Sequence, residues 1–136
     1  MITTYNSHSR GITDLKAHLV LVTKSRKKVI DAEIMRRLEG IVVSTCSKWG
    51  VQVVEFNGEA DHIHLLFSYY PQLQLSKFIN NLKTVTSRLI RKDFAEKLSL
   101  VYFKPVFWTK SYFLASCGGV TVETLKKYVQ EQVTPS

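Results

Sequence analysis

The sequence predicts an α+β fold of the ferredoxin-like or RRM-like type, in which two helices cover one face of a single antiparallel sheet. Strand-like apolar runs and two long segments of helical spacing follow each other in the order β-α-β-β-α-β. The 136 residues are enough for one domain with a core of this size. We therefore expect residues 1–136 to form one domain, with a polar arm at 1–12 and an extra helix near the C-terminus.

The first predicted strand and helix are joined by a basic turn. Residues 14–23 are rich in Leu and Val and predict a buried strand, and residues 24–28 carry the basic turn. From residue 31 to residue 49 the apolar spacing becomes helical. Asp31 is the expected N-cap of this helix, and Gly50 is expected to end it.

The middle of the chain predicts a hairpin followed by a second helix. Residues 51–56 and 62–70 have the composition of strands, and Asn57-Gly58 offers turn chemistry between them. Residues 76–94 have apolar side chains at helical spacing. This order gives the sheet its second and third strands before the second helix.

The last third of the chain predicts a strand, a break and a helix. Residues 101–116 are rich in aromatic side chains and predict a strand, with an interruption near Pro105. Gly118-Gly119 opens a break at residues 118–120, and a helix is expected over residues 121–132. Glu123 lies in its first turn, where the helix dipole favours an acid.

The charge balance indicates a polyanionic partner. Lys and Arg outnumber Asp and Glu by 19 to 11, which gives a formal net charge of +8, and nucleic acid is the most common partner for such a surplus. A solvated surface is the alternative. The side chains that we expect at DNA phosphates lie in the arm, the basic turn and the second helix: Arg10, Lys24, Arg26, Lys27, Lys83 and Arg88.

The cysteines and the hydropathy pattern exclude several classes of protein. Cys46 and Cys117 form no Cys-x-x-Cys pair, so we expect two buried free thiols rather than a zinc or redox motif. No apolar run approaches the length of about 20 residues that a membrane span needs. The expectation is a cytoplasmic, nucleoid-associated protein without a membrane partner or a small-molecule substrate.

The segment Asp61-His62-Ile63-His64-Leu65 carries the clearest chemical signal. Alternate residues of a strand point the same way, so His62 and His64 should share one face while Ile63 enters the core. Two imidazoles so placed can bind one divalent ion. Two solvated histidines on an exposed face are the alternative.

The predicted last helix supplies two partners for this pair. Tyr128 and Gln132 are four residues apart and share a helical face. The Gln132 carbonyl oxygen with the two imidazoles would form a ligand set suited to Mg²⁺ or Mn²⁺. Tyr128 would present its phenol beside that ion, where a cation on the phosphate oxygens of a phosphodiester favours attack by an activated phenol. The alternative for Tyr128 alone is ordinary aromatic packing.

Four motifs together resemble the single-tyrosine HUH transposases of small bacterial and archaeal insertion sequences (IS200-like). They are DHIHLLF, FWTKSYFLASCGG, LKKYVQEQ and, upstream, AHLVLVTKSRKKVI with His18. HUH denotes His-hydrophobe-His, which His62, Ile63 and His64 match. The resemblance extends from about residue 14 to residue 132.

The resemblance implies an activity and a role for each matched residue. Tyr128 matches the nucleophile that forms a 5′-phosphotyrosine link, and His62, His64 and Gln132 match the metal ligands. It implies a DNA transposase that cuts and rejoins single-stranded DNA at element ends with subterminal hairpins. It also implies a homodimer, in which the helix carrying Tyr128 can complete the partner's active site by moving on a hinge at residues 118–120.

Two other functions remain open from the sequence. A domesticated nuclease that processes chromosomal palindromes could have the same site residues, and only terminal hairpins flanking the gene would distinguish a mobile element from it. A non-catalytic RRM-like module would explain the fold and charge but not His62, His64, Tyr128 and Gln132 together. It would also be expected to carry an aromatic and glycine motif on a central strand, which this sequence lacks.

Overall fold

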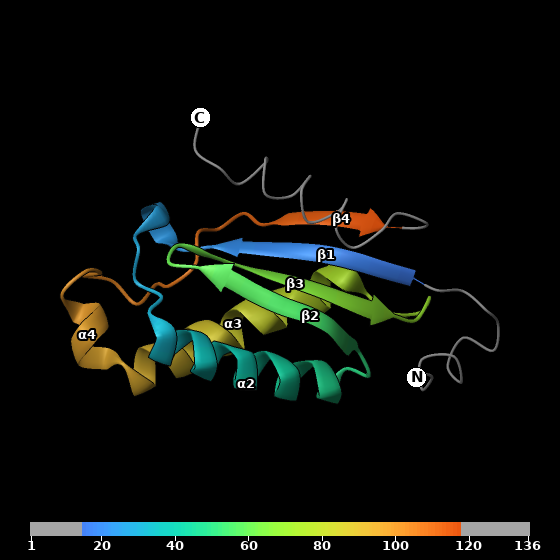
Figure 1. Ribbon diagram of the computed structural model, residues 1–136, viewed down its shortest axis with the longest axis horizontal. Helices are drawn as coiled ribbons and strands as arrows, with labels where there is room; N and C mark the ends of the chain where they lie inside the picture. The colour runs from blue at the N-terminus through green and yellow to red at the C-terminus, as the bar shows by residue number, and fades with distance from the viewer. Residues whose placement is uncertain (1–14, 118–136) are drawn as a thin grey trace.

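The computed structural model describes residues 15–117 of the chain, and Figure 1 shows their arrangement as one sheet with helices beside it. The predicted arm at 1–12, the break at 118–120 and the helix at 121–132 lie outside the described residues. The described elements are β1 (Leu15–Val22), the 3-10 turn η1 (Lys24–Arg26), α2 (Ala32–Lys48), β2 (Gln52–Glu59), β3 (His62–Tyr69), α3 (Leu75–Asp93), α4 (Ala95–Ser99) and β4 (Phe113–Cys117).

The four described strands form an antiparallel sheet in the order β2-β3-β1-β4. β1 and β2 each pair with β3, so they run parallel to each other with β3 between them. This is the split β-α-β arrangement of a ferredoxin-like sandwich. The predicted fold class is therefore confirmed for the sheet and the two helices α2 and α3.

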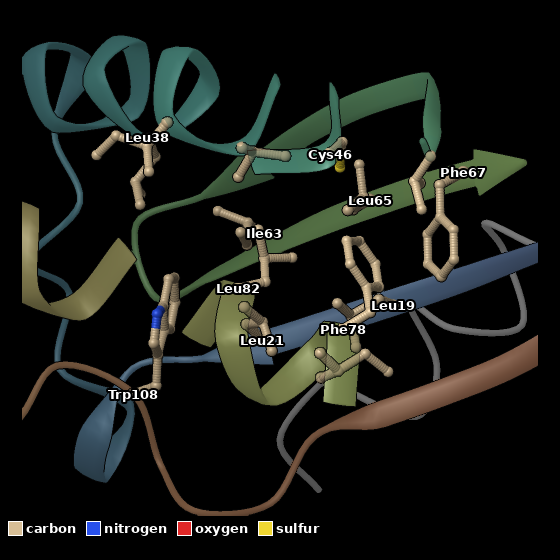
Figure 2. Close-up of a cluster of buried hydrophobic side chains, with 14 of the residues drawn as sticks. Leu19, Leu21, Leu38, Cys46, Ile63, Leu65, Phe67, Phe78, Leu82 and Trp108 are labelled. Atoms are coloured by element: carbon tan, nitrogen blue, oxygen red, sulfur yellow. The ribbon is translucent and has the colours of Figure 1, made fainter. Parts of the chain in front are cut away.

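The core lies between one face of the sheet and the helices α2 and α3 (Figure 2). Alternate residues of β3, Ile63, Leu65 and Phe67, enter it as the strand period requires. Phe78 of α3 is fully buried against Phe67, with ring centroids 5.2 Å apart. This packing fixes which face of β3 points away from the helices.

Helix α2 begins and ends as its sequence predicts. The Asp31 side chain caps the helix by accepting a hydrogen bond of 2.9 Å from the backbone N–H of Ile34. Gly50 follows the C-cap residue Trp49 with φ of 69°, a left-handed conformation that glycine adopts without steric cost. Both boundary predictions are confirmed.

Asn57 and Gly58 do not form the predicted turn. They lie inside β2 and pair with His64 and Ile63, and the chain reverses at Ala60-Asp61 instead. A Cβ atom on Gly58 would lie 2.4 Å from the carbonyl oxygen of His62. The glycine is needed for the close approach of two strand backbones rather than for a turn.

Most of the predicted strand at 101–116 is irregular. Only Phe113–Cys117 pairs regularly with β1, and Trp108 makes one isolated bridge with Thr23. The buried Trp108 donates from Nε1 to the Thr86 hydroxyl at 2.8 Å, and that hydroxyl donates to the Leu82 carbonyl. Trp108 thus anchors the irregular segment to α3. The short helix α4 was not predicted.

The face of the sheet away from α2 and α3 carries a second, smaller apolar cluster. Its buried members are Val20, Leu66 and Cys117.

Cys46 and Cys117 are both buried and free, as predicted, and burial raises the pKa of the Cys46 thiol to about 12. Within residues 15–117, no helix is long and apolar enough to cross a membrane.

Candidate functional site

His62 and His64 lie together on the sheet face that points away from α2 and α3. Their relative exposures are 4% and 7%, so they are not the solvated histidines that the sequence left as an alternative. The two Nε2 atoms face each other at 3.1 Å, and the rings are nearly perpendicular, at 87°. The predicted pair is therefore formed, with its Nε2 atoms within hydrogen-bonding distance of each other.

The strand that carries the pair is held on both sides. In the register of β3, Val22 of β1 and Glu59 of β2 flank His62, and Val20 and Asn57 flank His64. A strand inside a sheet has its backbone groups paired in both directions, so the two imidazoles are attached to a rigid backbone.

Asp61 orients the first histidine of the pair. Its Oδ1 atom lies 2.8 Å from Nδ1 of His62. Because an ionised carboxylate can only accept, Nδ1 is the ring nitrogen that donates, which leaves Nε2 as the atom that presents a lone pair whenever the ring is neutral. Burial alone would raise the pKa of Asp61, but the hydrogen bond and charge of His62 and the charge of Arg26 together lower this pKa. The carboxylate is thus ionised and available to His62.

The turn after β1 holds Asp61 in place. The backbone N–H of Thr23 donates to the Asp61 carbonyl at 3.0 Å. The Thr23 hydroxyl donates to the Lys27 carbonyl at 2.7 Å and lies 3.2 Å from the Asp61 carbonyl oxygen. Arg26 adds an ion pair to the Asp61 carboxylate at 3.3 Å. The chain that precedes the histidines is therefore joined to the end of β1 by backbone and side-chain contacts.

η1 has an unusual backbone that brings Arg26 to this position. Ser25 and Arg26 have φ of 58° and 54°, in the left-handed region that non-glycine residues seldom adopt. The turn is held from the other side by the Tyr102 hydroxyl, which donates to the Lys24 carbonyl at 2.8 Å. The Lys24 N–H also donates to the Phe107 carbonyl at 2.9 Å. These contacts offset the local strain.

A third histidine, His18, lies beside His64. Sequence spacing alone did not predict this position. The ring centroids of His18 and His64 are 5.3 Å apart, and His18 is 1% exposed. Because His18 belongs to β1, only the register of two strands far apart in sequence brings it there. The sequence reasoning noted His18 in a matching motif but had no signal for this contact.

The histidine pair fits two ligand positions of a divalent ion. With bonds of about 2.1 Å at a right angle, two ligand atoms stand about 3.0 Å apart, close to the 3.1 Å between the Nε2 atoms. Residues 15–117 contain no group of three His, Cys, Asp or Glu that could bind a metal. Gln132 and Tyr128, the predicted third ligand and nucleophile, lie outside the described residues.

The predicted DNA-binding residues lie in different environments. Lys24, Lys27 and Arg88 are exposed, whereas Arg26 is partly buried in its ion pair with Asp61. Lys83 donates to the carbonyls of residues 109 and 110, and burial lowers its pKa. Arg10 lies outside the described residues. Phosphate contact by these residues stays a prediction.

An open pocket lies beside the Asp61 end of the sheet. Its volume is about 370 Å³, and it is lined by the end of β1, by η1 and by the segment that leads into β4. The lining residues include Val22, Ser25, Arg26, Thr109 and Tyr112. This pocket lies next to the turn that holds Asp61.

Comparison with known proteins places the chain in a class. The family model described as "Transposase IS200 like" matches residues 11–132. The chain belongs to the IS200-like transposase family.

Individual relatives agree with this assignment. The chain is 28% identical over 127 residues to the transposase for insertion sequence element IS200 of Salmonella typhimurium, covering 93% of this chain and 81% of that protein. It is 26% identical over 121 residues to the ISDra2 transposase TnpA of Deinococcus radiodurans, covering 89% and 86%. The family match favours a transposase over the non-catalytic RRM-like module that the sequence left open.

Two solved structures have a similar fold. A crystal structure described as a transposase from Deinococcus radiodurans R1 has a TM-score of 0.75 at 24% identity, covering 90% of this chain and 93% of that one. A REP-associated tyrosine transposase bound to a REP hairpin has a TM-score of 0.61 at 8% identity, covering 88% and 64%. Both show the fold alone.

Proposed function

We propose that this transposase cuts and rejoins single-stranded DNA at the ends of an insertion sequence through a 5′-phosphotyrosine on Tyr128. The observation that carries the proposal is the pair of buried imidazoles with Nε2 atoms 3.1 Å apart, held on an internal strand of a chain in this family. His62, His64 and Gln132 are the proposed ligands of a Mg²⁺ or Mn²⁺ ion.

The reaction is a transesterification. The Tyr128 oxygen forms a bond to phosphorus, the bond from phosphorus to the 3′ oxygen breaks, and the phenolic proton ends on the released 3′-OH. The bound ion would supply charge stabilisation at the phosphate oxygens. The phosphotyrosine conserves the energy of the broken bond, so a free 3′-OH can reverse the attack and join strands.

The fixed parts of the site belong to the chain itself. Asp61 sets the tautomer of His62, and β1 and β2 hold the strand that carries both imidazoles. A preorganised pair needs little rearrangement when it binds an ion and a phosphate. The pocket beside Arg26 is where we place the DNA backbone that approaches the pair.

The proposed DNA substrate carries hairpins, and the proposed active form is a homodimer. A structural neighbour of this chain is bound to a REP hairpin, which supports a hairpin as the recognised element here. The net charge of +8 suits binding to the phosphates of such a substrate. We propose that Tyr128 acts in the subunit that contains the histidines or in its partner.

A covalent-trapping assay tests the proposal. Purified protein is mixed with labelled single-stranded DNA from both flanks of its gene, with Mg²⁺ or Mn²⁺, and run on a denaturing gel. We expect a metal-dependent protein–DNA adduct that disappears completely in Tyr128→Phe, because phenylalanine lacks the attacking oxygen.

Tyr70→Phe is the matched control for this assay. Tyr70 follows β3 at the end opposite His62, where its hydroxyl donates to the Trp49 carbonyl, so the variant should keep the adduct. An adduct that persists in Tyr128→Phe would reject the proposed nucleophile. Double-stranded flanks cut as readily as single-stranded ones would reject the single-strand mechanism.

The contact between Asp61 and His62 leads to a prediction for metal binding. Asp61→Asn removes the negative charge that fixes the His62 tautomer, so Mn²⁺ should bind about 10- to 100-fold more weakly, the range seen when partners of metal-ligating histidines are lost. Isothermal titration calorimetry of the full chain with Mn²⁺ measures this affinity without any cleavage assay.

Asp93→Asn serves as the control because Asp93 is an exposed carboxylate paired with Arg37. It should bind Mn²⁺ as the wild-type protein does. If Asp61→Asn and wild type have the same affinity for Mn²⁺, Asp61 has no role in positioning His62 for the ion.

A further inference from the structure

The segment between α4 and β4 displays an aromatic side chain to solvent. Phe103 is 97% exposed, and the nearby Leu100 is 84% exposed. Single exposed apolar residues are common on proteins and by themselves mean little. The surroundings of Phe103 decide what it can do.

The backbone on both sides of Phe103 is anchored. Tyr102 donates its backbone N–H to the Leu98 carbonyl and its hydroxyl to the Lys24 carbonyl, each at 2.8 Å. Beyond Phe103, the buried side chains of Phe107 and Trp108 enter the core. The exposed ring is therefore presented from a fixed backbone rather than from a loosely held loop.

The same anchors place Phe103 next to the basic turn. The segment that contains it is bonded to η1 at two points: the Tyr102 hydroxyl donates to the Lys24 carbonyl, and the Lys24 N–H donates to the Phe107 carbonyl. The next residue, Lys104, is exposed, as are Lys24, Lys27 and Lys28. The one aromatic side chain that is almost wholly exposed within residues 15–117 thus belongs to a segment that is hydrogen-bonded to the basic turn and carries an exposed lysine of its own.

Proteins bind unpaired nucleotides with exposed aromatic rings that have basic side chains near them. The ring stacks on a base, which is accessible only where the base is unpaired, and the ammonium groups contact the phosphates on either side. Two carboxylates at the start of α2, Asp31 and Glu33, both interact with Lys97 of α4. Their charges are thus partly compensated.

We propose that Phe103 is a stacking platform for an unpaired base of the DNA strand bound by the basic turn, so that the loop and η1 form one single-strand binding surface. This inference rests on the proposed function and adds a residue that recognises unpaired DNA. The turn after β1 connects this surface to the histidines. The backbone N–H of Thr23 donates to the carbonyl of Asp61, which precedes His62, and the backbone N–H of Lys24 donates to the Phe107 carbonyl in the loop.

The test compares Phe103→Ala, Phe103→Trp and Leu100→Ala in the full chain. Fluorescence anisotropy measures binding to a single-stranded oligonucleotide from the gene's flank and to the same sequence as a duplex. We expect Phe103→Ala to weaken single-strand binding about tenfold, with an unchanged slope against salt because stacking releases no counterions. Duplex binding should stay the same.

The companion variants separate stacking from general apolar contact. Phe103→Trp should retain wild-type affinity and quench 2-aminopurine placed in the strand, whereas Leu100→Ala should bind as wild type does. Equal single-strand affinity of Phe103→Ala and wild type, equal losses in Phe103→Ala and Leu100→Ala, or equal losses for single strand and duplex would each overturn the inference. The proposed function fails separately, by the absence of the Tyr128 adduct in wild-type protein.

Discussion

His64→Ala should reduce DNA cleavage by at least about a hundredfold while leaving hairpin binding within about twofold of wild type. The variant removes one of two imidazoles whose Nε2 atoms face each other at 3.1 Å. Even the outer partners of metal ligands affect activity by about 10- to 100-fold, so loss of a proposed ligand should cost at least as much. His64 is 7% exposed and offers little surface to DNA.

The measurement is a pair of assays on the same preparation: cleavage of labelled single-stranded flank DNA, and anisotropy of the hairpin. Lys27→Ala is the reciprocal control, because Lys27 is exposed in the basic turn. It should weaken binding and reduce the slope of affinity against salt by about one unit. Equal loss of cleavage and binding in folded His64→Ala would mean that the two functions share one surface.

Phe78→Ala should destabilise the protein by about 3–5 kcal/mol, the range found for truncating a buried phenylalanine. Phe78 is fully buried, and its ring contacts Phe67 of β3 and Trp49 after α2, with centroid distances of 5.2 Å and 5.8 Å. Truncation would leave a cavity where α2, α3 and the sheet meet.

Urea unfolding monitored by circular dichroism measures the free energy of unfolding. Phe103→Ala makes the same chemical change at a side chain that is 97% exposed, and it should alter stability by no more than about 0.5 kcal/mol. Similar losses in the two variants would show that burial of Phe78 does not determine its contribution.

The two long helices and β3 could be predicted because each has a local signal. Apolar spacing identified α2 and α3, and strict alternation assigned His62 and His64 to the opposite face from Ile63. Each of these signals is the period of apolar residues within one helix or strand, so it can be read without knowing how the rest of the chain folds.

The predictions that were wrong concern features that tertiary contacts decide. Asn57-Gly58 has turn chemistry, but pairing with β3 keeps it extended. The aromatic residues of 101–112 favoured a strand because aromatic side chains are common in strands, where one face is usually buried. Phe107 and Trp108 are buried by separate insertion into the core rather than by regular strand pairing.

The candidate site was predictable only in part. The spacing of His62 and His64 predicted their shared face, and a carboxylate next to the first histidine was visible in the sequence without an assigned role. The contacts of Asp61 with Arg26 and of His64 with His18 join segments far apart in the chain, and no periodicity encodes them. Tyr128 and Gln132 stay predictions.

The strand order β2-β3-β1-β4 has a consequence for how the chain folds. β2 and β3 are neighbours in sequence and can pair early through local loop closure, whereas β4 pairs with β1 across roughly a hundred residues. Long-range closure is entropically costly and slow. During synthesis β4 is the last described strand to emerge, so the hairpin bearing both histidines can form while one edge of the sheet is still missing.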